Sequence, residues 1–370
     1  MKNLYVGLMS GTSLDGIDAA LVETDGQDTR LLHTHYHEYD TPTRHLLKKL
    51  ASAASCQPGD IGRADAMLGS LFADCVNDLL ARYQVPAQTI SAIGSHGQTI
   101  AHAPTGNLGF TLQIGDPNRI AALTGITTVA DFRRMDIAYG GQGAPLVPLF
   151  HQAAFGAMGR SQAIINIGGI SNVSLLPGNS RHARLLGFDT GPGNTLMNEW
   201  IQINRGKDYD HNGDWAQEGT VDSILLQHML DDPYFAAPPP KSTGTDYFSL
   251  DWLKKMISRL THAPTAENVQ ATLCALTATS IKGAVLSHMP EPDRVLLCGG
   301  GARNKTLRHL IQQQFSCNVD ISDSCGIPAE WVEACAFAWL ADQRLRGIAI
   351  NTPQITGASR PCLLGAVYLS

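Results

Sequence analysis

The sequence predicts a mixed α/β protein made of two similar domains. Strand-like runs alternate along the chain with amphipathic helical stretches, a pattern typical of α/β folds. A strand–turn–strand unit near the N-terminus, with a turn of small and polar residues, occurs again in mid-chain with a Gly-Gly turn. Two related hairpins about half a chain apart indicate a duplicated fold, and the length of 370 residues suits two domains.

The composition is that of a globular protein with many tight turns, since 44% of the residues are hydrophobic, 16% are charged and 36 are glycine. The 27 basic and 33 acidic residues give a net charge of −6, and there is no long basic run. This balance argues against binding nucleic acid or an anionic membrane through bulk charge. An acidic protein that binds polyphosphate must instead use backbone amides and a divalent cation.

The N-terminal segment and the cysteines indicate the cellular compartment. The first apolar run is too short for the core of a signal peptide, and no uninterrupted apolar segment reaches membrane-spanning length. The eight cysteines are scattered without a CxxC pair, as expected of reduced thiols. We therefore expect a soluble cytoplasmic protein that binds neither membrane nor nucleic acid.

The first hairpin joins the strand-like runs Leu4–Met9 and Ile17–Val22 through the turn GTSLDGID. Gly11 and Gly16 have the spacing of a phosphate-binding P-loop, but a P-loop continues with Lys and Ser/Thr and then a helix. Here Ile and Asp follow, and then a strand. A hairpin turn of small residues can still offer its N–H groups to an anion. The loop therefore indicates a nucleotide-binding protein of another architecture.

The second hairpin, Ala163–Leu176, has apolar strands on both sides of a Gly-Gly/Ser/Asn turn. A third Gly-rich turn, CGGGARN, lies between the strand Val295–Cys298 and a helix that begins near Lys305. Glycines at this position let a flat ligand approach the backbone. The turn lacks the GxGxxG fingerprint of a Rossmann dinucleotide-binding site, so the sequence does not support such a site. The other expected elements are helices at Arg63–Tyr83, Thr195–Asn204, Ala266–His288, Asn304–Phe315 and Glu330–Arg346, and strands at Ala92–Ser95, Thr127–Ala130, Leu185–Asp189 and Arg294–Cys298.

The chain contains, in this order, the strings LMSGTSLDGIDAALVE, GSHGQT, ADFRRMDIAYGGQGAPLVP, NIGGISNVSLL, GFDTGPGNTLMN and LLCGGGARN. Together they resemble the anhydro-N-acetylmuramic acid kinase family, within the hexokinase–actin superfamily, over nearly the whole chain. The resemblance implies a duplicated actin/hexokinase-like fold with an ATP and sugar cleft between the domains. The implied N-terminal domain is residues 1–135 plus 352–370, and the C-terminal domain is residues 136–351. The resemblance also implies a homodimer.

The implied activity is that of an ATP-dependent kinase in peptidoglycan recycling. It opens the 1,6-anhydro bridge of 1,6-anhydro-N-acetylmuramic acid with water and phosphorylates O6, giving N-acetylmuramic acid 6-phosphate and ADP. ATP and Mg²⁺ are the implied cofactors. The ATP-binding residues carried by the matching strings are Gly11, Thr12, Ser13, Leu14, Asp15, Gly16, Ile17, Asp18, Gly168, Gly169, Gly299, Gly300 and Asn304.

Three aspartates carry the expected chemistry. Asp189 ends a predicted strand and precedes TGPGN, which places its carboxylate where α/β folds bind ligands. A carboxylate can act as a general base, and the resemblance makes Asp189 the catalytic residue that activates water; an Asx-turn or helix cap is the alternative. Asp15 and Asp18 lie in a phosphate loop without lysine, so we expect them to hold Mg²⁺, directly or through water. Turn formation is their alternative role.

The expected sugar-binding residues are His96, Arg133 and Glu333. Arg133 and Arg134 follow a predicted strand, and one of the two can pair bidentately with the lactyl carboxylate of the substrate. Glu333 lies in a nearly apolar run, where a carboxylate needs a partner, although acidic residues in the first turn of a helix also complement its dipole. His96 follows a strand end, where a lone histidine is otherwise more often structural.

Three segments depart from known patterns. In PPPKSTGTDYF, Thr245 and Asp246 stand where the family has Arg-Glu. An EF-hand-like opening at residues 208–213 has Gly219 at the twelfth position, which should be a bidentate Glu. Three histidines, 33, 35 and 37, alternate on one strand face, but no carboxylate or cysteine follows at ligand spacing. The sequence therefore favours a solvated face for them.

Two other functions compete with the kinase. A filament-forming or ATP-switched protein of the same superfamily would share the nucleotide hairpins, but the string GFDTGPGN supplies a base for a sugar site. A glycoside hydrolase built on the carboxylates of Asp189 and Glu333 would turn over without nucleotide.

Overall fold

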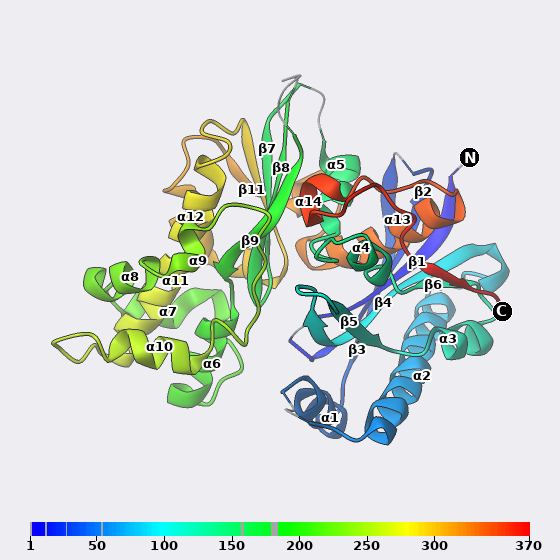
Figure 1. Ribbon diagram of the computed structural model, residues 1–370, viewed down its shortest axis with the longest axis horizontal. Coiled ribbons are helices and arrows are strands. Elements are labelled where there is room, and N and C mark those ends of the chain that lie inside the picture. The colour runs from blue at the N-terminus through cyan, green and yellow to red at the C-terminus, as the bar shows by residue number, and fades with distance from the viewer. Residues whose placement is uncertain (1, 12, 27, 53–54, 157–158, 179–183) are drawn as a thin grey trace. The chain divides into compact units, whose positions relative to one another are not determined.

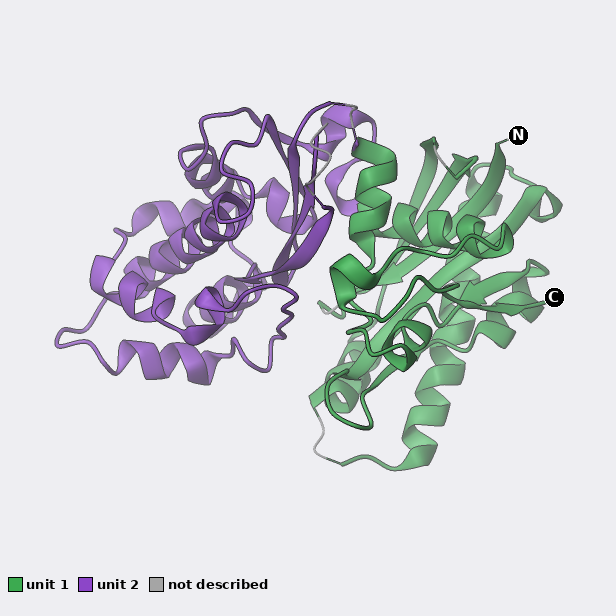
Figure 2. Cartoon of the chain, turned by 45° about the horizontal axis from the view of Figure 1, so that its top comes forward, with its two compact units in different colours: residues 1–155, 331–370 green, residues 156–330 purple. Residues whose placement is uncertain are grey.

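The computed structural model describes all residues except 1, 12, 27, 53–54, 157–158 and 179–183. The chain divides into two compact units, shown in Figure 2: unit 1 is residues 1–155 and 331–370, and unit 2 is residues 156–330. These units differ from the domain boundaries expected at 135/136 and 351/352, because residues 136–155 and 331–351 pack with unit 1.

Unit 1 contains a mixed sheet whose strand order is β12-β6-β4-β1-β2-β3, with β5 paired to β4. The first three strands in sequence form an antiparallel meander, and β4 then runs parallel to β1, and β6 parallel to β4. The strands are β1 (Asn3–Ser10), β2 (Gly16–Thr24), β3 (Thr29–Glu38), β4 (Ile90–Ala103), β5 (Phe110–Ile114), β6 (Thr128–Ala130) and β12 (Ala366–Tyr368).

Helices cover both faces of this sheet (Figure 1). Val6 and Leu8 of β1 belong to an apolar cluster with Phe72 of α2. Gly7, between them, points to the opposite face, where a Cβ would come 1.8 Å from the Ala334 carbonyl oxygen of α13. The helices of unit 1 are α1 (Thr41–Ser52), α2 (Pro58–Arg82), α3 (Pro117–Thr124), α4 (Arg134–Ala138), α5 (Val147–Phe155), α13 (Val332–Leu345) and α14 (Pro353–Thr356).

The sheet of unit 2 repeats the arrangement of unit 1. Its order is β11-β10-β7-β8-β9, in which β7, β8 and β9 form an antiparallel meander, β10 runs parallel to β7, and β11 parallel to β10. The same order occurs in unit 1 as β6-β4-β1-β2-β3, so the duplicated α/β fold predicted from the sequence is confirmed. The strands are β7 (Gln162–Ile167), β8 (Ile170–Leu176), β9 (Leu186–Pro192), β10 (Arg294–Cys298) and β11 (Val319–Ile321).

The longest helix of unit 2, α11, packs against the sheet strands β8 and β9 and against several other helices. It is long and apolar enough to cross a membrane by length and composition, but 72% of its apolar window is buried inside the unit, as in the core helix of a globular protein. The helices of unit 2 are α6 (Thr195–Arg205), α7 (Asp214–Glu218), α8 (Ser223–Leu230), α9 (Pro233–Ala236), α10 (Leu250–Ile257), α11 (Ala266–Leu286) and α12 (Lys305–Gln312).

Candidate active site

The GTSLDGID turn connects β1 to β2 and is fixed at its base by buried polar side chains. The Ser10 hydroxyl lies 2.6 Å from Gln98 Oε1 and 2.9 Å from the Gly16 carbonyl oxygen. Gln98 Nε2 donates to the Gly11 carbonyl at 3.2 Å, and the Tyr39 hydroxyl donates to Ser10 Oγ at 3.0 Å. Both ends of the turn are therefore held from inside unit 1.

The predicted magnesium ligands lie on this turn and at the start of β2. Asp15 is exposed and its Oδ1 accepts from the Ser13 hydroxyl at 2.6 Å, while Asp18 is half-buried in β2. Burial raises the pKa of Tyr36 most, and the negative charges of Asp15 and Asp18 raise it further. Both carboxylates therefore affect the ionisation of the same tyrosine. Two neighbouring carboxylates are a donor set that suits Mg²⁺. Of the other nucleotide candidates in the turn, Thr12 lies outside the described residues.

The structure brings together His96 and Arg133, two of the predicted sugar-binding residues. Arg133 donates from Nε and Nη2 to His96 Nε2, at 3.1 and 2.9 Å, and from Nη1 to the Gly143 carbonyl at 2.7 Å. Because Nε2 accepts, the proton of the imidazole must be on Nδ1, which lies 2.8 Å from the Gly97 carbonyl oxygen. Burial and then the Arg133 charge hold the pKa of His96 well below its usual value. His96 is therefore a neutral histidine that orients Arg133.

The neighbouring arginine has a different environment. Arg134 Nε pairs with Asp131 Oδ1 at 2.7 Å, and the Arg134 side chain is 66% exposed. The hydrogen bond to that carboxylate raises the pKa of Arg134. Of the two candidates for the substrate carboxylate, Arg133 is the one that contacts another predicted site residue.

Glu333 lies in the first turn of α13 and is partly buried. Phe337, four residues later, shares its helix face, and the Phe337 ring packs 4.7 Å from the His96 ring. Glu333 therefore projects from the face of α13 that is turned toward His96. This places the three predicted sugar-binding residues in one part of unit 1.

In unit 2, the loop after α9 fixes Asp189. The Thr243 N–H donates to Asp189 Oδ2 at 2.9 Å, and the Asp189 N–H donates to the Lys241 carbonyl at 3.1 Å. The Tyr234 hydroxyl donates to the Asp189 carbonyl at 2.8 Å. The charged amine of Lys241 donates to the Tyr234 carbonyl at 3.0 Å, and burial lowers its pKa. Asp189 thus stands in β9 with one carboxylate oxygen already oriented by a backbone amide.

The tip of the second hairpin, Gly168–Gly169, packs on Gly193 and Asn194, which follow β9 directly. The N–H groups of Gly193 and Asn194 donate to the Gly169 and Gly168 carbonyls at 2.9 and 2.8 Å. A Cβ on Gly193 would lie 2.3 Å from the Gly168 oxygen, so only glycine fits there. The hairpin tip and the segment that carries Asp189 are therefore one hydrogen-bonded piece.

The third glycine turn follows β10, as predicted, and α12 begins at Lys305. Gly299 has φ +77, and a Cβ there would lie 2.3 Å from Asn166 Oδ1, whereas a Cβ on Gly300 would meet no described atom within 4 Å. Asn166 Oδ1 is buried and accepts no hydrogen bond from the described residues. The open space over Gly300 leaves its backbone accessible to a flat ligand, as the sequence analysis expected. Asn304, another predicted nucleotide residue, caps α12, because its Oδ1 accepts from Leu307 N at 3.0 Å.

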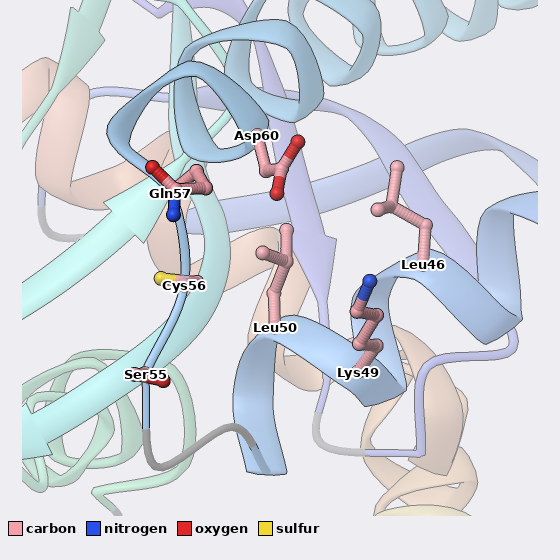
Figure 3. Close-up of a pocket in the computed structure, with 7 residues that line it drawn as sticks. All are labelled: Leu46, Lys49, Leu50, Ser55, Cys56, Gln57 and Asp60. Atoms are coloured by element: carbon pink, nitrogen blue, oxygen red, sulfur yellow. The ribbon is translucent and has the colours of Figure 1, made fainter.

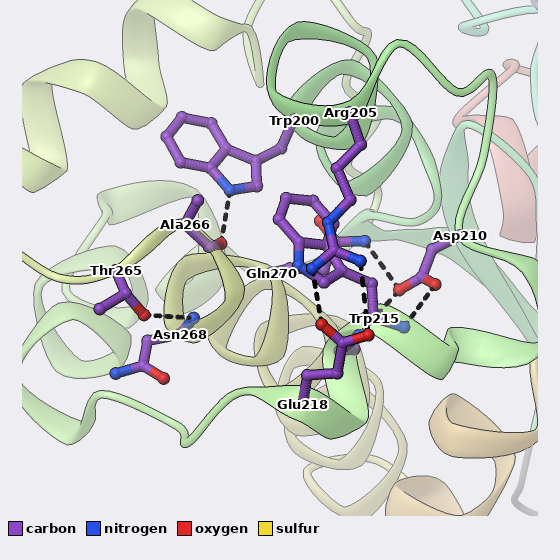
Figure 4. A network of polar contacts seen from close by, with 10 residues as sticks. Trp200, Arg205, Asp210, Trp215, Glu218, Thr265, Ala266, Asn268 and Gln270 are labelled. Carbon is purple, nitrogen blue, oxygen red and sulfur yellow. Dashed lines mark hydrogen bonds and ion pairs between the residues drawn. The ribbon is translucent and has the colours of Figure 1, made fainter.

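Asp210 and Glu218 of the EF-hand-like segment are committed to the fold (Figure 4). Asp210 is buried and its carboxylate accepts from the N–H groups of Trp215 and Ala216 at 2.9 and 3.0 Å, and from Gln270 Nε2 at 3.1 Å. Glu218 pairs with Arg205 at 2.6 Å. This carboxylate pattern caps α7 rather than forming a calcium loop.

A shallow pocket lies apart from all predicted site residues, between α1 and the start of α2 (Figure 3). It is lined by Leu46, Lys49, Leu50, Ser55, Cys56, Gln57 and Asp60. It contains no group that the sequence analysis connects with catalysis.

Several residues that build the site were not singled out from the sequence. Ser10 and Gln98 fix the phosphate loop, and Tyr234, Lys241 and Thr243 position Asp189. Gln98 lies in the string GSHGQT, and Lys241 and Thr243 lie in PPPKSTG, so family strings carried this information. The contacts themselves join residues far apart in the chain.

Comparison with known proteins gives one family. A family model described as anhydro-N-acetylmuramic acid kinase matches residues 3–370. A protein of that name from Saccharophagus degradans is 48% identical over 370 residues, covering 99% of each chain. Proteins of the same name from Shewanella pealeana and Pasteurella multocida are 46% and 45% identical, covering 99% and 98% of this chain and 99% and 96% of their own. The chain therefore belongs to the anhydro-N-acetylmuramic acid kinase family, which makes it a phosphotransferase that acts on a sugar.

Proposed function

We propose that this chain converts 1,6-anhydro-N-acetylmuramic acid, ATP and water into N-acetylmuramic acid 6-phosphate and ADP. The oxygen of water forms a bond to the anomeric carbon while the bond from that carbon to O6 breaks. O6 then bonds to the γ-phosphorus, and the bond from that phosphorus to the β,γ-bridging oxygen breaks as ADP leaves. The observation that carries the proposal is Asp189, which stands in β9 with Oδ2 held by the Thr243 amide.

Asp189 is the proposed base that takes a proton from the attacking water. General bases act within hydrogen-bond reach of the proton they remove, and they need a fixed orientation. The Thr243 N–H, the Lys241 carbonyl and the Tyr234 hydroxyl fix the residue at three points.

Phosphate binding is assigned to backbone amides and Mg²⁺ rather than to a lysine. The turn between β1 and β2 offers its backbone, Gly168–Gly169 offers a second hairpin tip, and Gly299–Gly300 offers a surface for the adenosine. Asp15 and Asp18 would hold Mg²⁺, directly or through water. That ion neutralises charge on the phosphates and on the transferring group.

Sugar binding is assigned to the group in unit 1. Arg133, held by His96 and the Gly143 carbonyl, would pair with the lactyl carboxylate. Glu333, on the His96 side of α13, would accept from hydroxyl or amide groups of the sugar. We further propose that the protein is a cytoplasmic homodimer, as the family resemblance implies.

The test is product analysis by mass spectrometry after incubation of the protein with the anhydro sugar, ATP, Mg²⁺ and ¹⁸O-labelled water. The proposal predicts one label on the anomeric oxygen and phosphate on O6. Ring opening without ATP would instead establish the hydrolase. ADP release that ignores the sugar, together with ATP-dependent sedimentation, would establish the filament-forming alternative.

A further inference from the structure

The histidines of β3 do not form the solvated face that the sequence favoured. His35 pairs opposite Ala19, and His37 opposite Ile17, and both β2 residues are fully buried. Side chains at paired positions share a face of the sheet, so the two histidines lie on the face that packs against α2. There Cys75 of α2 lies with its Sγ 3.9 Å from the Ile17 carbonyl oxygen.

The carboxylate missing from the local sequence comes from α2. Asp78 follows Cys75 by three residues, which places both on the same side of the helix. Asp78 Oδ2 lies 3.9 Å from His35 Nε2. One ligand atom from each of His35, His37 and Asp78 lies within 4.8 Å of the other two. The His35 side chain is 18% exposed and that of Asp78 is 62% exposed, so the cluster is anchored on the strand and open to solvent at the helix.

We propose that His35, His37 and Asp78 form a Zn²⁺ site that joins the edge strand β3 to α2. Two imidazole nitrogens and a carboxylate oxygen are a donor set that zinc binds, with water as the fourth ligand. A tetrahedral zinc holds its ligand atoms about 3.3–3.5 Å apart. Bringing the ligand atoms of His35, His37 and Asp78 to these distances therefore needs side-chain movements of about 1 Å, which the exposed Asp78 can make.

This site is distinct from the proposed magnesium ligands. Asp18 pairs opposite Tyr36, and Tyr36 alternates with His35 and His37 along β3. Asp18 therefore lies on the other face of the sheet from the zinc cluster. Zinc would act on the stability of this sheet edge, because a ligand that binds only the folded state stabilises it.

The third histidine of the strand gives a matched control. The His33 ring stacks on Tyr83 of the α2 end, with centroids 3.9 Å apart and planes 13° apart. It is outside the three-residue cluster. His33→Gln removes an imidazole from the same strand face without removing a proposed ligand.

The experiment uses the full chain, freed of metal by a chelator and kept under a reductant that does not bind zinc. Zn²⁺ is titrated against a chromogenic chelator, and thermal unfolding is followed with and without zinc. We expect one equivalent bound by the native chain and by His33→Gln, with a raised unfolding midpoint. His35→Gln, His37→Gln and Asp78→Asn should each lower the affinity on the order of 100-fold, since even outer-shell changes cost 10–100-fold, and should lose the rise in midpoint.

Cobalt(II) substitution separates this site from adventitious binding by cysteine. The proposal predicts visible bands of a nitrogen- and oxygen-ligated ion without a thiolate charge-transfer band. A thiolate band would overturn it, and so would zinc affinity unchanged in the three ligand variants. Circular dichroism and sugar-dependent ADP release confirm that each variant is folded, because none of these residues belongs to the proposed catalytic machinery.

Discussion

The environment of Asp189 combines a strand position with a backbone amide that orients one carboxylate oxygen. Asp189→Asn keeps the shape and the hydrogen-bond acceptor but cannot take a proton. We expect turnover to fall on the order of 10²–10⁴-fold, the usual contribution of a general base, with ATP affinity unchanged. Turnover by quenched-flow and ATP binding by calorimetry check this, and near-normal turnover would rule out Asp189 as the base.

Arg133 and Arg134 are adjacent, and the structure separates their roles through their partners. Arg133→Ala removes the group held by His96 and the Gly143 carbonyl, so we expect the KM for the sugar to rise about 10–100-fold, which corresponds to a charge-assisted hydrogen bond of about 1.5–3 kcal/mol. The KM for ATP should not change. Arg134→Ala, which loses only an exposed ion pair with Asp131, is the control. Equal effects of the two changes would contradict the assignment of Arg133.

At the scale of elements, long helices and apolar strands were predictable from the sequence, including the short strand β6, whereas the short strands β11 and β12 were not. The predicted strand Arg294–Cys298 has the observed ends, and the helix predicted at Ala266–His288 is observed as Ala266–Leu286. Strand β4, predicted as Ala92–Ser95, extends to Ala103 because its polar second half pairs with β5. The three-residue strands β11 and β12 exist only through their partners, which local patterns do not encode.

For the candidate active site, as for the elements, local sequence signals were predictable, whereas contacts between distant residues were not. Glycine turns are local signals, and they located the turn between β1 and β2 and the Gly299 turn. Asp189 was predicted to end its strand, but β9 continues to Pro192 because its last residues pair with β8, so Asp189 lies within the strand. The bond between Ser10 and Gln98 joins residues 88 positions apart, and no spacing rule finds such a contact. The His35–Asp78 pair was missed for the same reason, since a search limited to neighbouring residues cannot reach the next helix.

Contact between α13 and the sheet of unit 1 is made through glycines, and this gives a test of packing. A Cβ on Gly94 would lie 2.0 Å from the Phe337 carbonyl oxygen, and backbone cannot rotate away as a side chain can. We expect Gly94→Ala to lower the free energy of unfolding by about 3 kcal/mol or more, at the upper end of overpacking costs. Urea unfolding measures the change.

Gly62, within α2, is the matched control for that experiment. A Cβ there would meet no described atom within 4 Å. Gly62→Ala should raise the free energy of unfolding by about 0.5–1 kcal/mol, because alanine restricts the unfolded chain and favours the helix. Equal losses in both variants would show that Gly94 is not constrained by α13.

At the scale of the whole molecule, buried neutral histidines make stability depend on pH. Burial lowers the pKa of His151 to about 3 and, with the Arg133 charge, holds the pKa of His96 well below its usual value. Since the unfolded chain binds these protons near pH 6.5, stability is full above that pH and is lost as the pH falls toward the lowered values. Each histidine contributes up to about 1.4 kcal/mol per pH unit.

Both histidines belong to unit 1, so its unfolding should be the step that responds to acidification from pH 7 to pH 5. Urea unfolding at several pH values, followed by hydrogen exchange of each unit, measures this. His151→Gln should reduce the pH slope by about one proton. A slope that is the same in the variant and the native chain would mean that His151 is not held neutral.

The contact of α13 with β1 also bears on how binding of one substrate affects binding of the other. At Gly7 the strand packs directly on the backbone of α13, so we expect a displacement at the first turn of α13, where Glu333 lies, to move β1 as well. The far end of β1 is Ser10, which anchors the phosphate loop. With Glu333 at the sugar and this turn at the phosphates, as proposed, sugar occupancy and the conformation of the turn should be thermodynamically linked. Each substrate should change the affinity for the other by the same factor, as reciprocity requires.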